Sequence, residues 1–345
     1  MATKKYYKID ILLNAQKKYK TLFIAEYLIP ILKKNREISP ESRFFFQRTV
    51  DVGPIIRIYF HTHDVNVTTM YELISKVLKE FYYTYSSELR ENSVYSKQML
   101  NIKKMNRLSY QRTDYVNYTV DLELIEQIDR KGEYLSENTK KNVNDWWFQF
   151  EELIEDTFLY LYGHNEIEQM KFLVSLFYIC SKKLDNQTHN GYLSFKSHYL
   201  GFVNNKRNSM KQYDTKIREY YEQNKEEFAM IINRNSTENL VKNDEYKIYL
   251  RRWEIAIEHF TNTQAKEKSK FNILNIIPML RFRKYSDFHN EAFKVKKLKF
   301  YLSNEFQRYR SLVNQIYLLL PSLGFNTVKR LIAAYSLTRI LEEEE

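Results

Sequence analysis

The spacing of hydrophobic residues changes near residue 135, and this change constrains the fold more than any other feature of the sequence. Before that point, runs rich in β-branched and aromatic residues predict strands, while apolar residues three or four apart predict helices between them. The predicted strands are residues 7–14, 44–48, 55–60 and 110–122, and the predicted helices are 20–35 and 69–89. The order β-α-β-β-α-β is that of a ferredoxin-like unit.

Three local signals refine this first part. Gly53-Pro54 predicts a turn, so the strands on either side of it should form a hairpin. Thr69-Met-Tyr-Glu72 resembles a capping box and predicts the start of the second helix. Pro30 falls inside the first helical pattern, where the lack of an N–H group favours a kink or an early end.

The second part of the chain shows helical periodicity. Apolar residues three or four apart predict a first helical face, made of Trp147, Phe150, Ile154, Phe158 and Leu161. The further predicted helices are residues 166–184, 192–203, 208–233, 244–261 and 291–341. Pro321 and Gly324 should break the last of these, with Asn326 as a new N-cap. The predicted fold class is therefore α+β, with a sheet-containing part at 1–135 and a mostly helical part at 136–345, packed as one continuous unit.

The composition narrows the classes of function. Six Gly among 345 residues, with no Gly-rich phosphate-binding motif, argue against a nucleotide-binding loop. The single Cys180 cannot form an internal disulfide and is predicted to be a small buried hydrophobe, which fits a reducing cytoplasm. The sequence shows no signal peptide and no apolar run near the roughly 18 residues of a membrane span, so a cytoplasmic location is expected.

The chain is basic, with a formal net charge of +11. Such a surface could bind nucleic acid or an acidic peptide. Because the positive charges are spread along the chain and mixed with acids, nucleic acid is the weaker expectation. His61-Thr-His63 places two imidazoles on one face of a predicted strand, but no Cys/His cluster supplies further ligands, so no metal site is predicted.

Three segments together resemble a known family. They are Val52-Gly-Pro-Ile-Ile-Arg-Ile58, Gly191-Tyr-Leu-Ser-Phe-Lys-Ser-His198 and the stretch from Tyr309 to Arg330. The chain resembles, over nearly its whole length, the C-terminal domain of lantibiotic dehydratases, which also occurs alone as thiopeptide-type bacteriocin biosynthesis proteins. The family's frequent His after Gly-Pro is Ile55 here.

The resemblance implies roles for residues of the predicted sheet. Arg57 matches an arginine that holds a glutamyl ester leaving group in the eliminating members, since a guanidinium can grip a carboxylate with two hydrogen bonds. The equal alternative is that Arg57 pairs with a structural acid. Arg48 is a second candidate for binding substrate, and Tyr118 is a candidate catalytic residue. Asp121 stands where the eliminating members carry Glu, and their Arg-Tyr-Gly-Gly segment is absent, which weakens the case for elimination.

The resemblance also points to Ser194-Phe-Lys-Ser-His198. In the eliminating members the His of this segment is an acid or base, a role that suits an imidazole near neutral pH. His198 and Ser197 are therefore candidate catalytic residues, with Ser194 and Tyr199 as candidate substrate-binding residues. A core or capping role for His198 is the alternative.

The resemblance implies two enzymatic functions. The first is the thiopeptide pyridine synthase reaction, a formal aza-[4+2] cycloaddition of two dehydroalanines in a precursor peptide, with loss of water and leader peptide. The second is the glutamate-eliminating half of a split dehydratase, and a non-enzymatic basic binding module is a third alternative. No cofactor is implied. The expected partners are an acidic leader and core peptide and other modification enzymes of the pathway.

Overall fold

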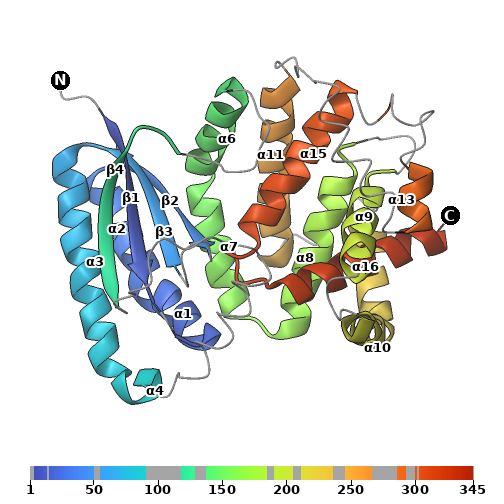
Figure 1. Cartoon of the computed structure of the whole chain (residues 1–345), viewed down its shortest axis with the longest axis horizontal. Helices are drawn as coiled ribbons and strands as arrows, with labels where there is room; N and C mark the ends of the chain where they lie inside the picture. Colours follow the sequence, from blue (N-terminus) through green and yellow to red (C-terminus); the bar gives the residue numbers. More distant parts are fainter. Residues whose placement is uncertain are drawn as a thin grey trace. The chain divides into compact units, whose positions relative to one another are not determined.

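In the computed structural model the chain forms two compact units, drawn in Figure 1. Unit 1 comprises Met1–Glu133, Asn144–Tyr162 and Pro321–Gly324, and unit 2 comprises Tyr134–Val143, Gly163–Leu320 and Phe325–Glu345. Unit 1 thus takes in a helical stretch beyond the predicted boundary at residue 135. The structure describes residues 4–13, 15–49, 55–90, 118–128, 137–184, 190–204, 211–235, 245–265, 286–292, 300 and 303–344.

Unit 1 contains a four-stranded antiparallel sheet. Its strands are β1 (Lys5–Leu12), β2 (Arg43–Thr49), β3 (Ile55–Thr62) and β4 (Thr119–Ile125). The strand order is β2-β3-β1-β4, and every neighbouring pair is antiparallel. Together with the helices between β1 and β2 and between β3 and β4, this order is ferredoxin-like, as the sequence predicts. The predicted α+β fold class is confirmed.

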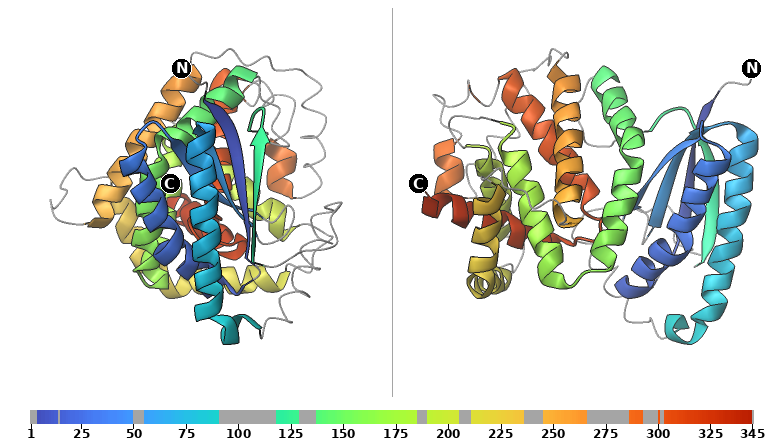
Figure 2. Two further views of the ribbon diagram at one scale, coloured as in Figure 1. Left: turned by 90° about the vertical axis from the view of Figure 1, so that its left-hand side faces the viewer. Right: turned by 180° about the vertical axis from the view of Figure 1, so that it is seen from behind.

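The two faces of the sheet differ in what covers them. Tyr7, Ile9 and Ile11 of β1 point to one face and are buried. The left panel of Figure 2 shows α1, α2 and α3 in front of this face. Alternate residues, among them Asp10, point to the opposite face because side chains alternate along a strand.

The first helix is continuous over residues 17–38 but changes its winding in the middle. It consists of α1 (Lys17–Phe23), the π-helical turn η1 (Ile24–Leu28) and α2 (Ile29–Ile38). Pro30 lies in the first turn of α2. A proline lacks the N–H that would bond four residues back, so the irregular winding falls in the turn just before it. The sequence predicted the place of the irregularity but not its form.

The second crossover helix begins earlier than predicted. α3 spans Asp64–Thr84, and the short α4 (Ser86–Arg90) follows it. Thr69 is inside α3, where its hydroxyl donates to the carbonyl of Val65 at 3.1 Å, so the predicted capping box is wrong. His63 is the N-cap residue of α3 and does not share a face of β3 with His61. The predicted Gly53-Pro54 turn and residues 110–117 of the predicted fourth strand lie outside the described residues.

Aromatic side chains bury part of the second face of the sheet. They come from α6 (Glu137–Gln149), and α7 (Glu151–Tyr162) follows it. The ring of Phe45 on β2 lies 5.2 Å from that of Trp147 and 4.9 Å from that of Phe148, between centroids. Glu151 accepts a hydrogen bond of 2.9 Å from the backbone N–H of Phe44 and so occupies a donor on the edge strand β2.

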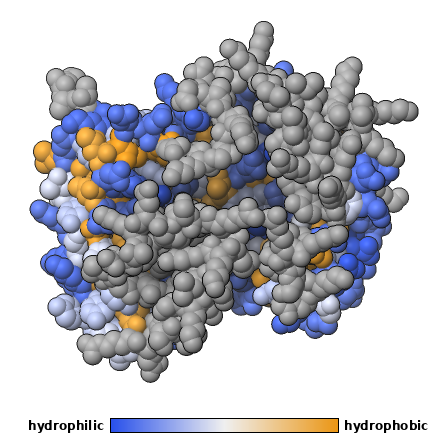
Figure 3. Space-filling model, in the orientation of Figure 1, coloured by the Kyte–Doolittle hydropathy of each residue, from blue (hydrophilic) through white to orange (hydrophobic). Residues whose placement is uncertain are grey.

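The other edge strand, β4, exposes hydrophobic residues. Leu122 is 37% exposed and Leu124 is 58% exposed. In Figure 3 hydrophobic residues gather over the part of unit 1 where Figure 1 labels β4. The register pairs Leu122 with Ile9 and Leu124 with Tyr7, so these leucines lie on the same face of the sheet as the buried residues of β1.

Unit 2 is helical in all the segments that the structure describes. Its helices are α8 (Glu166–Ser181), α9 (Tyr192–Val203), α10 (Lys211–Asn235), α11 (Glu245–Ala265), α13 (Asp287–Ala292), α15 (Asn304–Leu319) and α16 (Thr327–Glu344). The bounds of α9 are those predicted from the sequence. Almost all of α8 from Phe172 to Cys180 is buried, so this helix forms the centre of the unit's core. No helix among the described residues is long and apolar enough to cross a membrane.

The break between the last two helices follows the sequence prediction. Gly324 adopts a φ of +86°, a conformation that glycine reaches without steric cost. Asn326 then caps α16, with its side-chain oxygen accepting a hydrogen bond of 2.9 Å from the backbone N–H of Lys329. Cys180 is fully buried, as predicted.

Candidate functional site

The candidate residues of the sequence analysis fall into two sets. Arg48, Arg57 and Tyr118 belong to the sheet of unit 1. The other four lie on α9 of unit 2 and are Ser194, Ser197, His198 and Tyr199. That both sets line one cavity stays a prediction, and each set is described within its own unit.

Arg57 on β3 forms an ion pair with Asp10, which lies directly opposite on β1. The guanidinium donates two hydrogen bonds to the carboxylate, from Nε to Oδ1 at 2.7 Å and from Nη2 to Oδ2 at 2.8 Å. Both side chains are largely buried, with exposed fractions of 14% and 11%. Of the two roles expected for Arg57, this geometry is that of pairing with a structural acid.

The same face of the sheet carries further compensated polar groups. Lys8 of β1 pairs with Glu123 of β4 across the strands. The ring of Tyr6 stacks on that of His61 with 4.5 Å between centroids. Among the described residues, the charges of this face therefore largely neutralise one another.

Arg48 and Tyr118 lie elsewhere in unit 1. The backbone N–H of Arg48 donates to the Ser322 hydroxyl at 3.4 Å, and its positive charge adds to desolvation in lowering the pKa of buried Lys20 to about 7. Tyr118 precedes β4 in a left-handed conformation, with φ of 62°, and its ring centroid lies 4.4 Å from that of Tyr82. Such a backbone is strained for a bulky residue, and burial raises the pKa of the Tyr118 hydroxyl.

Gly191 fixes the position of α9. A Cβ atom at this residue would lie 1.8 Å from the carbonyl oxygen of Ser181, so only glycine allows the start of α9 to approach the end of α8 so closely. The hydroxyl of Tyr309 on α15 donates to the Gly191 carbonyl at 2.6 Å. The Gly191-Tyr-Leu-Ser segment is thus held between two helices, and Ser194 also interacts with the Tyr309 hydroxyl.

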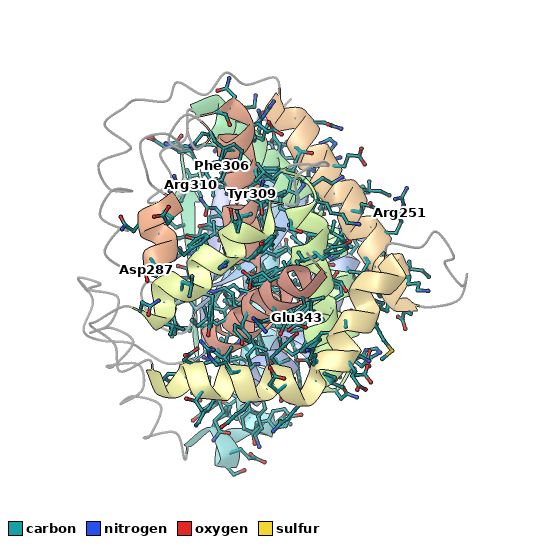
Figure 4. The ribbon with its side chains drawn as sticks, turned by 90° about the vertical axis from the view of Figure 1, so that its right-hand side faces the viewer. Arg251, Asp287, Phe306, Tyr309, Arg310 and Glu343 are labelled. Atoms are coloured by element: carbon teal, nitrogen blue, oxygen red, sulfur yellow. The ribbon has the colours of Figure 1, made fainter. Side chains whose placement is uncertain are left out.

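His198 lies among aromatic and positively charged side chains. Its ring is exposed and lies 4.5 Å from that of Tyr317 on α15, between centroids. The guanidinium of Arg330 on α16 lies 5.0 Å from the same tyrosine ring. Arg330 is half-buried, and among the described residues no carboxylate pairs with it. Figure 4 shows a further arginine, Arg310, next to Tyr309 on α15.

This environment keeps the imidazole of His198 neutral. Desolvation by the surrounding protein, then the charges of Arg330 and Arg310, lower the pKa of His198 to about 4. Because the exposed ring keeps part of its hydration, the neighbouring arginines are the firmer reason for the direction of this shift. A neutral imidazole that solvent can reach is able to exchange protons with a bound molecule.

The remaining candidates on α9 have partners inside unit 2. The hydroxyl of Tyr199 donates to Asp214 on α10, and desolvation and this bond raise the pKa of Tyr199. Ser197 is half-buried, and its Oγ lies 3.0 Å from Nε2 of His289 on α13. Tyr199 is therefore fixed in the helical core, whereas Ser197 is half-buried and its hydroxyl lies beside the imidazole of His289.

Sequence reasoning assigned no site role to four residues around α9, namely His289, Arg310, Tyr317 and Arg330, although the last three lie in the Tyr309–Arg330 stretch that carries the resemblance. They lie about 90 to 130 positions along the chain from His198, so no local spacing connects them with it. The capping pattern at Ser286, three residues before His289, is the one local signal that marked the start of α13. The described residues contain no group of three His, Cys, Asp or Glu side chains that could hold a metal ion.

The fold is similar to two solved structures along the whole chain. "Pyridine synthase, TbtD, from thiomuracin biosynthesis" matches with a TM-score of 0.58 and 14% identity, over 98% of this chain and 98% of that chain. A second match is "Crystal structure of TsrL", with a TM-score of 0.61 and 14% identity, over 99% of this chain and 95% of that chain. The resemblance predicted from the sequence is thus confirmed at the level of the fold. Neither a protein-family model nor a curated protein matches the sequence.

Proposed function

We propose that this protein is an enzyme of ribosomal peptide maturation that acts as a pyridine synthase. It would join two dehydroalanines of a precursor peptide by a formal aza-[4+2] cycloaddition. Loss of water and of the leader peptide would then give a pyridine-centred macrocycle. The observation that carries this proposal is the match in fold to TbtD over 98% of both chains.

The surroundings of His198 support a proton-transfer role in this reaction. The cycloaddition needs one amide in its iminol form, and later steps remove water, so protons must move at several atoms. An accessible neutral imidazole can accept and return such protons. Holding the two alkenes close together would supply much of the remaining rate enhancement.

The direct test is to offer the purified protein a linear, dehydrated, azole-bearing precursor peptide and to follow the products by mass spectrometry. The expected products are a macrocycle and a released leader peptide. A glutamylated peptide should remain unchanged, because the Arg-Tyr-Gly-Gly segment of the eliminating proteins is absent. Modification of neither peptide would overturn the enzymatic proposal and favour a binding module.

A second candidate function is glutamate elimination from glutamylated Ser or Thr. The observation that favours it is the pair of arginines whose charges act on His198. A guanidinium can bind the glutamyl carboxylate while the imidazole removes the Cα proton, after which the C–O bond breaks and glutamate leaves. Release of free glutamate without a macrocycle would select this function over the first.

The net charge of +11 supports an acidic leader peptide as the binding partner. Exposed charges attract such a peptide over a distance that salt shortens to about 8 Å at physiological ionic strength. Titration of a fluorescent leader peptide at rising salt should therefore show weakening affinity. An affinity independent of salt would mean that apolar contacts or added strand pairing hold the leader.

A further inference from the structure

A chain of hydrogen bonds joins α9 and α13 in unit 2. The Oγ of Ser197 lies 3.0 Å from Nε2 of His289, and the Oγ of Ser286 lies 2.7 Å from Nδ1 of the same ring. Both nitrogens of the imidazole are thus engaged by hydroxyl groups, which can each donate or accept. The three residues are hereafter called the Ser197–His289–Ser286 relay.

The members of the relay differ in their exposure to solvent. His289 is 1% exposed, while Ser197 is half-buried and so keeps contact with solvent. The ring of His289 lies against α9 one turn beyond Ser197, because a Cβ on Gly201 would be 3.9 Å from Nε2. A bound molecule would therefore meet the Ser197 hydroxyl and not the imidazole.

Ser286 orients the ring. Its Oγ also accepts a hydrogen bond of 3.3 Å from the backbone N–H of His289, so Ser286 caps the start of α13 and stays in place relative to the ring. Desolvation lowers the pKa of His289, which keeps the imidazole neutral near pH 7, with one nitrogen as donor and the other as acceptor. The ring also hydrogen-bonds the backbone of Ser197, which opposes the effect of desolvation on the His289 pKa. When Nδ1–H donates to Ser286, Nε2 faces the Ser197 hydroxyl and can accept its proton.

We propose that the Ser197–His289–Ser286 relay carries protons for the substrate, with Ser197 as the group that touches it and His289 as a buried proton store. This inference rests on the proposed function. In the iminol step, the amide N–H proton moves to Ser197 Oγ as the Ser197 proton moves to Nε2. The imidazolium returns a proton by the reverse path to the amide oxygen, so the C–N bond becomes C=N, the C=O bond becomes C–OH, and no proton is consumed.

A covalent role for Ser197 is not supported. The residue lies in the middle of α9, where its own backbone N–H is used in the helix. A nucleophilic serine needs nearby backbone donors for the oxyanion that forms on acyl transfer. The relay therefore moves protons without forming an acyl-enzyme.

The test is a set of three variants of the full-length protein with the dehydrated peptide as substrate. Ser197→Ala and His289→Gln should each lower kcat by about 100-fold with KM changed by less than about twofold, since general acid–base catalysis contributes at least this much. The double variant should be no slower than the slower single variant, because both residues act on one proton. Asn290→Ala, exposed on α13 beside His289, is the matched control and should leave kcat unchanged.

A second readout separates proton transfer from a structural role. The solvent deuterium isotope effect on kcat should fall in Ser197→Ala and stay at the wild-type value in Asn290→Ala. Additive losses with an unchanged isotope effect would overturn the proposal. Circular dichroism melting curves identify any variant that is unfolded. If His289→Gln is unfolded, the kcat and isotope effect of Ser197→Ala, which replaces a half-buried side chain, decide whether the relay proposal holds.

Failure of the proposed function is distinguishable from failure of the relay. Wild-type protein that modifies no peptide would overturn the function alone. The relay is then tested by the imidazole ¹⁵N chemical shifts of His289, which report the tautomer. Ser197→Ala should change these shifts because it removes the partner of Nε2, and unchanged shifts would overturn the hydrogen-bonded relay itself.

Discussion

The positive charges of Arg57, on the sheet of unit 1, and Arg330, on α16 of unit 2, have different surroundings. Arg57 donates two hydrogen bonds to the carboxylate of Asp10, whereas Arg330 lies over Tyr317 with no carboxylate partner among the described residues. A buried cation that has its own acid contributes to the integrity of the fold. A half-buried cation without one is available to an anionic ligand. Sequence resemblance therefore points to Arg57 on the sheet, whereas the contacts within unit 2 point to Arg330 on α16.

The largest expected effect follows from removing the imidazole in unit 2. His198→Ala should lower kcat by roughly 100- to 10,000-fold with little change in KM, because the ring is proposed to move protons and not to anchor substrate. Single-turnover assays with the dehydrated peptide measure this. His259→Ala, an exposed histidine on α11, is the control. A rise in KM alone would place His198 among binding groups and would weaken the contrast between the two regions.

The second effect concerns stability in unit 1. Asp10→Asn leaves the buried Arg57 charge unpaired and should lower the local free energy of unfolding of β1 and β3 by about 3–5 kcal/mol. Hydrogen exchange of the amides in these strands measures it. The double variant Asp10→Leu with Arg57→Met should cost less than Asp10→Asn alone. Full stability together with lost activity would instead make the pair part of the functional site.

The third effect tests the uncompensated arginine. Arg330→Gln should weaken binding of an anionic substrate by roughly 10- to 100-fold, the value of one charged hydrogen bond. It should also raise the pKa of His198, since a neighbouring positive charge is removed, and NMR titration of the ring detects this. Arg251→Gln on α11, an exposed arginine shown in Figure 4, is the matched control. Equal effects of both variants would mean that only net charge matters.

The smallest effect is the pH dependence of stability that comes from Glu151 and Glu155, two buried carboxylates on α7 that pair with Arg36 of α2. Glu155 is almost fully buried, one of its oxygens has no hydrogen-bond partner among the described residues, and desolvation raises its pKa to about 7 in spite of Arg36. The folded state then binds more protons than the unfolded state between about pH 4 and 7, so stability should fall by about 1–3 kcal/mol as the pH rises from 5 to 8. Urea unfolding should show this fall in the wild type and a flatter curve in Glu155→Gln.

Glu152→Gln supplies the control for that measurement. Glu152 is the neighbour of Glu151 on α7, but its side chain is 62% exposed. Its replacement should leave the pH dependence unchanged. If the exposed and the buried variant behave alike, the net charge of unit 1 and not burial determines the pH dependence.

The sequence predicted those parts of the fold that depend on local patterns. The strands β1 to β3, the bounds of α9 and the Asn326 cap each follow from residues adjacent in the chain. The start of α3 was misplaced because Thr69 and Glu72 form a cap-like pattern inside a helix that already begins at Asp64. A local capping pattern of this kind is overridden when tertiary packing favours a helix that begins earlier in the chain.

The candidate site was predictable only in part, for a related reason. Ser197 and His198 were found because they lie in one recognisable segment. His289 and Arg330 come from other helices, and only the packing of α13 and α16 against α9 brings them into range. The pairing of Arg57 with Asp10 was likewise a matter of strand register, which the sequence left open between two roles.

The state of the single thiol has a practical consequence for experiments on this protein. Cys180 is fully buried in α8, and burial raises its pKa well above the ordinary value, so it reacts poorly with thiol reagents. A cysteine introduced at an exposed position, such as Tyr83 on α3, would therefore be labelled selectively in the native protein. Fluorescent or spin probes can be attached in this way without first removing the natural cysteine and disturbing the core around it.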